Sequence, residues 1–211
     1  MAKLKLVALA LCISMLMPVV AAATVLFTPD WDGEDGSTFQ EWSFDDDDNP
    51  AVPEVISNPY GGAEATITVG VGSPGWVESG FPPLTGYWDL SGEGGQIVLD
   101  IDNRPESLPY KEIWVQVTYD LWFYEPPTVD VPGAVYLEGE TAVVVGDWYL
   151  DLSKWRIEPN PAREQIILTA GPTYGSLIDQ IAVHTICVPE PTTIALLGLG
   201  SLSLLRRKRR A

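Results

Sequence analysis

Glycine and proline interrupt this chain so often that long helices cannot form. Its 211 residues include 19 Gly and 18 Pro, and the apolar residues between them alternate with polar ones instead of recurring every three or four positions. Thus Ile113, Val115 and Val117 share one face of a run in which Trp114 and Gln116 share the other. Gly and Pro break helices, and a period of two is typical of strands with one buried face.

Runs of this kind fill the interior of the chain between residues 24 and 187. They are 25–27, 41–44, 53–57, 63–71, 86–90, 96–102, 112–124, 134–137, 141–145, 148–150, 164–169 and 178–186. Short strands joined by Gly, Pro and Asp turns predict one all-β domain, an antiparallel β-sandwich of the jelly-roll type. A β-barrel is the alternative. The absence of an internal repeat argues against a propeller or a solenoid.

The charge of the chain is concentrated in this same interior. Twelve Lys and Arg stand against 29 Asp and Glu, but residues 24–188 hold five of the bases and 28 of the acids, a net charge of −23. Such a body repels phosphate backbones, which excludes a nucleic-acid partner. With 46% hydrophobic residues, eight of them Trp, the chain can still bury a core.

The first 23 residues have the three parts of a secretory signal peptide. Lys3 and Lys5 precede an apolar run over 6–20, and small residues follow it, with Ala21 and Ala23 at the two positions that signal peptidase reads. We therefore expect the Sec translocon and signal peptidase as partners and cleavage after Ala23. An uncleaved anchor helix is the alternative.

The last 24 residues also form a separate module. A Pro189-Glu190-Pro191 motif precedes an apolar stretch over 192–205, and the chain closes with five consecutive bases, 206–210. Fourteen residues span about 21 Å as a helix, less than the roughly 30 Å hydrocarbon core of a bilayer. The bases should stay in the cytoplasm. The pattern predicts a short hydrophobic helix that holds the protein transiently in the inner membrane, with the acidic body outside.

Residues 188–211 resemble the PEP-CTERM sorting signal of Gram-negative and related bacteria such as planctomycetes. The resemblance implies that a membrane-embedded exosortase, a cysteine protease-transpeptidase, recognises Pro189, Glu190 and Pro191. It also implies delivery to the cell surface or to the exopolysaccharide. A plain tail anchor is the alternative to this sorting function.

Few residues of the exported body offer catalytic chemistry. After loss of the signal peptide, Cys187 is the one thiol left and His184 is the one imidazole of the chain. No intramolecular disulfide can form, and a Cys/His metal site is excluded. We interpret Cys187 as a structural residue at a strand end and His184 as a strand surface residue. We therefore expect no enzyme, although two facing carboxylates could in principle make a glycoside hydrolase or lyase.

Aromatic side chains are the best indication of a ligand. Flat rings stack on the apolar faces of sugars, and Trp114, Trp122 and Tyr124 lie on the face of the run 112–124 opposite the predicted core face. They are our candidate carbohydrate-binding platform. The alternative is that these aromatic residues belong to the core of the domain.

Acidic residues near the start of the body resemble a calcium-binding loop. Asp30, Asp32, Glu34 and Glu41 occupy its first, third, fifth and twelfth positions, but Asp35 stands where a glycine is usual. We take Ca²⁺ binding here, or at the Asp run 45–48, as a possibility beside a solvated acidic turn. Apart from this, no cofactor is expected.

Together these features predict an exported β-sandwich with a structural or adhesive role at the cell surface or in the exopolysaccharide. A carbohydrate-binding module with an aromatic platform, supported by Ca²⁺ or not, is the second hypothesis. A glycoside hydrolase or lyase is the third.

Overall fold

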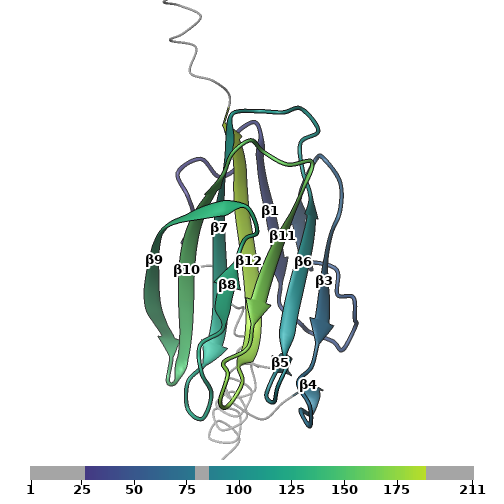
Figure 1. The fold of residues 1–211 in the computed structure, drawn as a ribbon, viewed down its shortest axis with the longest axis vertical. Coiled ribbons are helices and arrows are strands. Elements are labelled where there is room, and N and C mark those ends of the chain that lie inside the picture. The colour runs from purple at the N-terminus through teal and green to yellow at the C-terminus, as the bar shows by residue number, and fades with distance from the viewer. Residues whose placement is uncertain (1–26, 79–85, 189–211) are drawn as a thin grey trace, which may run out of the picture.

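The computed structural model describes residues 27–78 and 86–188, and all of the secondary structure in these ranges is β-strand (Figure 1). The predicted signal peptide and sorting signal, with Ala21, Ala23, Pro189, Glu190, Pro191 and the 192–205 stretch, lie outside the described residues. Within the described residues, no helix is long and apolar enough to cross a membrane.

Residues 27–78 and 86–188 contain twelve strands, which form two sheets. The strands are β1 Ser37–Trp42, β2 Val55–Ser57, β3 Ala63–Thr68, β4 Gly75–Val77, β5 Tyr87–Asp89, β6 Gln96–Asp102, β7 Tyr110–Asp120, β8 Thr128–Asp130, β9 Ala134–Val145, β10 Trp148–Ile157, β11 Arg163–Thr169 and β12 Leu177–Val188. The larger sheet has the order β2-β1-β12-β7-β10-β9, with β5 paired to the start of β12 and to β4. The smaller sheet has the order β3-β6-β11-β8.

The core lies between the two sheets. Every second residue of β7 from Ile113 to Tyr119 packs in one cluster with Leu99 of β6 and Ile166 of β11. All strand pairs in the described residues are antiparallel. The predicted all-β antiparallel sandwich is therefore confirmed, and the alternation along β7 identified its buried face correctly.

The jelly-roll prediction is not confirmed. A jelly roll has eight strands in two Greek keys, whereas here the larger sheet alone has eight strands. β9 forms a hairpin with β10 and extends the larger sheet by one strand (Figure 1). The larger sheet consequently reaches beyond β8, which is the edge strand of the smaller one.

Several details of the strand prediction were wrong. The run 41–44 is displaced from β1, which is Ser37–Trp42, and no run was predicted at β4 or β8. The runs 134–137 and 141–145 are parts of one strand, β9, and the run 148–150 continues to Ile157 as β10. β7 ends at Asp120 instead of continuing to 124, and Phe123, which the alternation of the run 112–124 places on the same face as Ile113, is 64% exposed in the loop that follows. Local alternation locates a strand, but it does not show where the backbone leaves the sheet.

The turn that leads into β12 depends on a glycine. Gly175 has φ +79°, and a Cβ built there would lie 2.2 Å from Ser91 Cα, whereas Gly146 has φ +57° with nothing within 4 Å of such a Cβ. We expect Gly175→Ala to lower the free energy of unfolding by about 2–3 kcal/mol, because strain and overlap add, and Gly146→Ala by about 1 kcal/mol. Urea unfolding of both variants tests this. Equal losses would contradict it.

Candidate functional site

The candidate site is the end of β12 at Val188, where the Pro-Glu-Pro motif begins. β12 pairs with β7 from Leu177 opposite Asp120 to Val188 opposite Tyr110. On its other side it pairs with β1, with Ser37 opposite Ile186. The last described strand is thus flanked on both sides as far as Ile186, and its pairing with β7 continues to its final residue, Val188.

An ion pair is buried directly behind this strand end. Lys111 Nζ of β7 lies 2.5 and 2.6 Å from the two carboxylate oxygens of Glu164 on β11, and both side chains are 0% exposed. Burial raises the pKa of Glu164, and the neighbouring ammonium of Lys111 opposes that shift. The pair joins the two sheets at the pole of the sandwich from which the sorting motif leaves.

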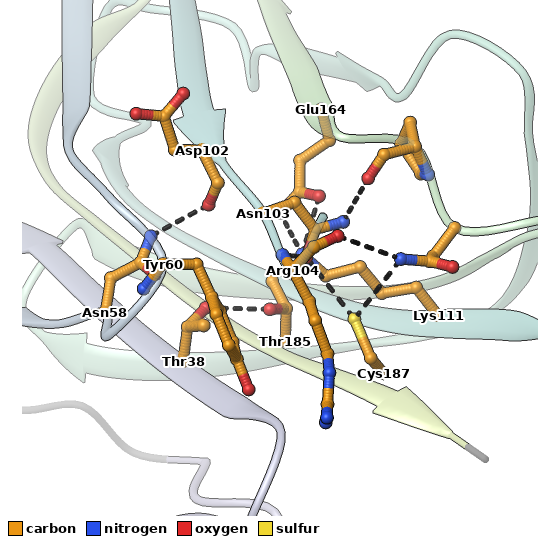
Figure 2. Close-up of polar contacts among 12 residues, drawn as sticks. Thr38, Asn58, Tyr60, Asp102, Asn103, Arg104, Lys111, Glu164, Thr185 and Cys187 are labelled. Atoms are coloured by element: carbon orange, nitrogen blue, oxygen red, sulfur yellow. Dashed lines mark hydrogen bonds and ion pairs between the residues drawn. The ribbon is translucent and has the colours of Figure 1, made fainter. Parts of the chain in front are cut away.

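Cys187 lies beside this pair and faces the same side of the sheet (Figure 2). Its thiol is 3.3 Å from Asn103 Oδ1, to which it donates, and 3.9 Å from Asn160 Nδ2. Burial raises the pKa of Cys187, so the reactive thiolate is disfavoured. The thiol packs as a structural residue at a strand end, the position that the sequence indicated.

Two buried asparagines fix the loops around the thiol. Asn103 Nδ2 donates to Pro161 O at 2.6 Å, and Asn160 Nδ2 donates to Glu106 O at 3.0 Å. Asn160 Oδ1 accepts a hydrogen bond from the backbone of Leu108. Each amide thus joins a loop before β7 to the loop before β11. Such buried polar networks, when their members are satisfied, give a region one defined conformation.

His184 corrects the sequence interpretation. It lies on the outer face of β12, but the turn 30–36 covers it, so it is buried instead of forming part of the surface. Its Nδ1 lies 3.1 Å from Asp32 Oδ1, and the Phe39 and Trp31 rings flank it. Burial lowers the pKa of His184. Among the described residues, its Nε2 has no hydrogen-bond partner.

The four candidate calcium ligands have separate environments. Asp30 is exposed in the turn, Asp32 faces His184, and the backbone carbonyl of Glu34 accepts hydrogen bonds from Ser37. Glu41 accepts a hydrogen bond from Gln180 at 2.7 Å, and burial raises its pKa. Within residues 27–78 and 86–188, no group of three or more acids, histidines or cysteines is arranged to hold a metal ion.

The three predicted platform aromatics do not share one surface. Trp114 lies on the outer face of the larger sheet, where the Trp31 ring meets it edge-on and Lys154 Nζ lies 4.2 Å above its centre. Trp122 is 58% exposed in the loop after β7 and stacks on Phe123. Tyr124 is half-buried and donates to Asp89 Oδ2 at 2.9 Å. The structure therefore separates the predicted set into three environments.

Sequence reasoning missed two features. The first is the Lys111–Glu164 pair, although a period of two from Ile113 back to Lys111 would have placed this lysine on the core face. The second is a groove of about 370 Å³ on the inner side of β9 and β10, which includes Tyr136 and Asp151. No local signal marks this groove, because it depends on β9 extending the larger sheet beyond β8.

Comparison with known proteins identifies the family to which the C-terminal module corresponds. The family model of the PEP-CTERM protein-sorting motif matches residues 188–210. No curated protein matches the chain. The described residues therefore form an all-β sandwich, and the sorting module begins at Val188, the last residue of β12. That module is a PEP-CTERM sorting motif, which implies export, passage through the membrane and processing by an exosortase-type membrane protein.

Proposed function

We propose that this protein is a non-catalytic surface protein with a structural or adhesive role in the envelope or the exopolysaccharide. The observation that carries the proposal is the position of the sorting motif, which starts at Val188, the last residue of the central strand β12. The role joins two parts: a tail that directs the protein to the surface and a β-sandwich whose strand β12 ends at the first residue of that tail.

The position of the sorting motif at the end of β12 suits a domain that bears a mechanical pulling force. Hydrogen bonds in antiparallel pairs run perpendicular to the strands, so a force along β12 acts on all the bonds to β7 and β1 together. The buried Lys111–Glu164 pair and the Cys187 network then connect the same strand end to the smaller sheet. This arrangement resists peeling at the point where the tail would transmit force.

The proposal predicts that sorting depends on Glu190. In the native cells, we expect Glu190→Ala in the full chain to abolish processing near the motif and surface delivery, with the protein retained in the membrane fraction. Thr193→Ser, a nearby change outside the motif, should be delivered like the wild type. Fractionation and surface immunolabelling measure this.

Unchanged surface delivery of Glu190→Ala would contradict sorting through the motif. The non-catalytic part has its own test. The protein purified from the cell surface, incubated with the exopolysaccharide of the same cells, should release no new reducing ends, and their release would contradict this part of the proposal.

A further inference from the structure

A groove opens where the two sheets differ in width. β9 runs from Ala134 to Val145, whereas β8, the facing edge strand of the smaller sheet, runs only from Thr128 to Asp130. The inner face of β9 and β10 is therefore only partly covered. The resulting groove has a volume of about 370 Å³, within the range of about 300–1,000 Å³ typical of ligand sites.

A fixed aromatic ring forms one wall of this groove. Tyr136 is 53% exposed, and Trp155 meets its ring edge-on with centroids 5.2 Å apart. The ring reaches across β9 because position 139 is glycine: a Cβ there would lie 2.6 Å from Tyr136 Oη. An exposed ring held by a buried one needs little ordering on binding, and such a ring can stack on the apolar face of a pyranose.

Hydrogen-bonding groups line the same groove as the ring. Asp151 Oδ1 accepts a hydrogen bond from the Thr141 hydroxyl at 2.6 Å, and Asp151 also accepts one from Tyr119. Ser153 Oγ accepts the Trp155 Nε1 hydrogen at 2.9 Å. A carboxylate held by two hydroxyl donors is oriented and still has lone pairs to accept hydrogen bonds from ligand hydroxyls.

The negative charge of the groove favours uncharged polysaccharides over anionic ones as ligands. Among the described residues its lining includes no Lys or Arg, and Asp151 is its acid on the inner face, since Glu140 is paired with Leu152 and alternates to the outer face. The nearest β10 cation, Lys154, is on the outer face, where it binds Glu138 at 2.6 Å and covers the Trp114 ring. An anionic polysaccharide would meet uncompensated repulsion here, whereas an uncharged one would not.

We propose that this β9 groove binds a segment of an uncharged polysaccharide, with Tyr136 stacking on a sugar ring and Asp151 accepting hydrogen bonds from its hydroxyls. The inference rests on the proposed adhesive role and names the ligand class and the site for it. It differs from the platform predicted from sequence, because it uses neither Trp114 nor Trp122.

The test is affinity electrophoresis of the protein purified from the cell surface. The probes are three uncharged polymers, dextran, laminarin and galactomannan, with alginate as the anionic comparison. We expect at least one uncharged polymer to retard the protein and Tyr136→Ala to weaken that binding about ten-fold or more. Tyr136→Phe, which keeps the stacking face, should stay within about two-fold of the wild type.

Matched variants keep the test decisive. Trp122→Ala removes an equally exposed aromatic side chain outside the groove and should bind like the wild type, and Gly139→Ala should weaken binding by displacing the Tyr136 ring. Thermal unfolding identifies any variant that fails to fold. If Tyr136→Ala is such a variant, Gly139→Ala and Trp122→Ala still decide, because the first should lose binding and the second should keep it. The proposal is overturned if no uncharged polymer binds, if alginate binds more tightly, or if Trp122→Ala loses binding while Tyr136→Ala keeps it.

The two proposals can fail separately. Tyr136→Ala leaves the sorting motif intact, so it should reach the cell surface in the assay used for Glu190→Ala. Normal delivery without glycan binding by the wild type would remove the groove and leave the surface role.

Discussion

Replacing Glu164 with glutamine is expected to lower the free energy of unfolding by about 3–5 kcal/mol, the usual loss when one partner of a buried ion pair is removed. The reason is that Lys111 Nζ has both Glu164 oxygens as its hydrogen-bond partners and is 0% exposed. The variant leaves the ammonium buried without a counter-charge. Urea unfolding of the purified protein measures the effect.

Two further variants separate the charge from the packing. Lys154→Met breaks the exposed pair between Lys154 and Glu138 and should cost no more than about 1 kcal/mol. The double variant Lys111→Met/Glu164→Leu replaces the buried pair by apolar groups of similar size and should recover most of the stability lost by Glu164→Gln. A Glu164→Gln variant as stable as the wild type would mean that the pair is neutral in the folded protein.

The effect of Glu164→Gln should be local as well as global. The pair lies beside Cys187, whose thiol is buried against Asn103. If the pole opens when the pair is broken, Cys187 becomes accessible to a thiol reagent at a lower urea concentration than the global unfolding midpoint. This would identify the ion pair as the link between the sorting-motif end of β12 and the smaller sheet.

Sequence reasoning succeeded where the decisive signal is local. Alternation over 112–120 predicted both the strand and its buried face, because Ile113, Val115 and Val117 repeat with a period of two. The sorting motif is likewise contiguous, over residues 188–210. Both features depend on neighbours in the chain, so a single sequence contains them.

Sequence reasoning failed where a feature depends on segments that are distant in the chain. His184 alternates like an outward-facing residue, and it does face outward, but the turn 30–36 covers it from 152 positions away. The β9 groove likewise needs β8 and β9 to lie at the edges of different sheets. Strand order and the covering of a face are properties of the tertiary structure, so alternation cannot predict them.

Asp179 is a residue whose titration is expected to make stability depend strongly on pH. It lies at the irregularity of β12 between Ile178 and Gln180, it is 3% exposed, and Asp45 is a nearby acid. Burial first, and the Asp45 charge second, raise its pKa from 3.8 to about 7. In the unfolded chain this carboxyl should have its ordinary pKa.

The direction of this pH dependence follows from the number of protons that the folded and unfolded states bind. Between pH 4 and 7 the folded state keeps the proton on Asp179 while the unfolded chain releases it, so this group lowers stability progressively as the pH rises through that window. Above pH 7 the folded protein bears the whole free-energy cost of the ionised, buried Asp179 carboxylate. A pKa of about 7 against 3.8 corresponds to at most about 4 kcal/mol.

Asp179→Asn should therefore stabilise the protein at pH 8 by up to about 4 kcal/mol and have little effect at pH 4, where the wild-type group is protonated in the folded state. Asp35→Asn, at a fully exposed side chain, controls for the loss of one negative charge and should change stability little at either pH. Urea unfolding at both pH values measures the difference between each variant and the wild type, which cancels the contributions of other acids. An Asp179→Asn variant that gains no more at pH 8 than at pH 4 would show that this carboxylate is solvated in the folded protein. In that case the β12 irregularity would be open to water and not part of the closed core.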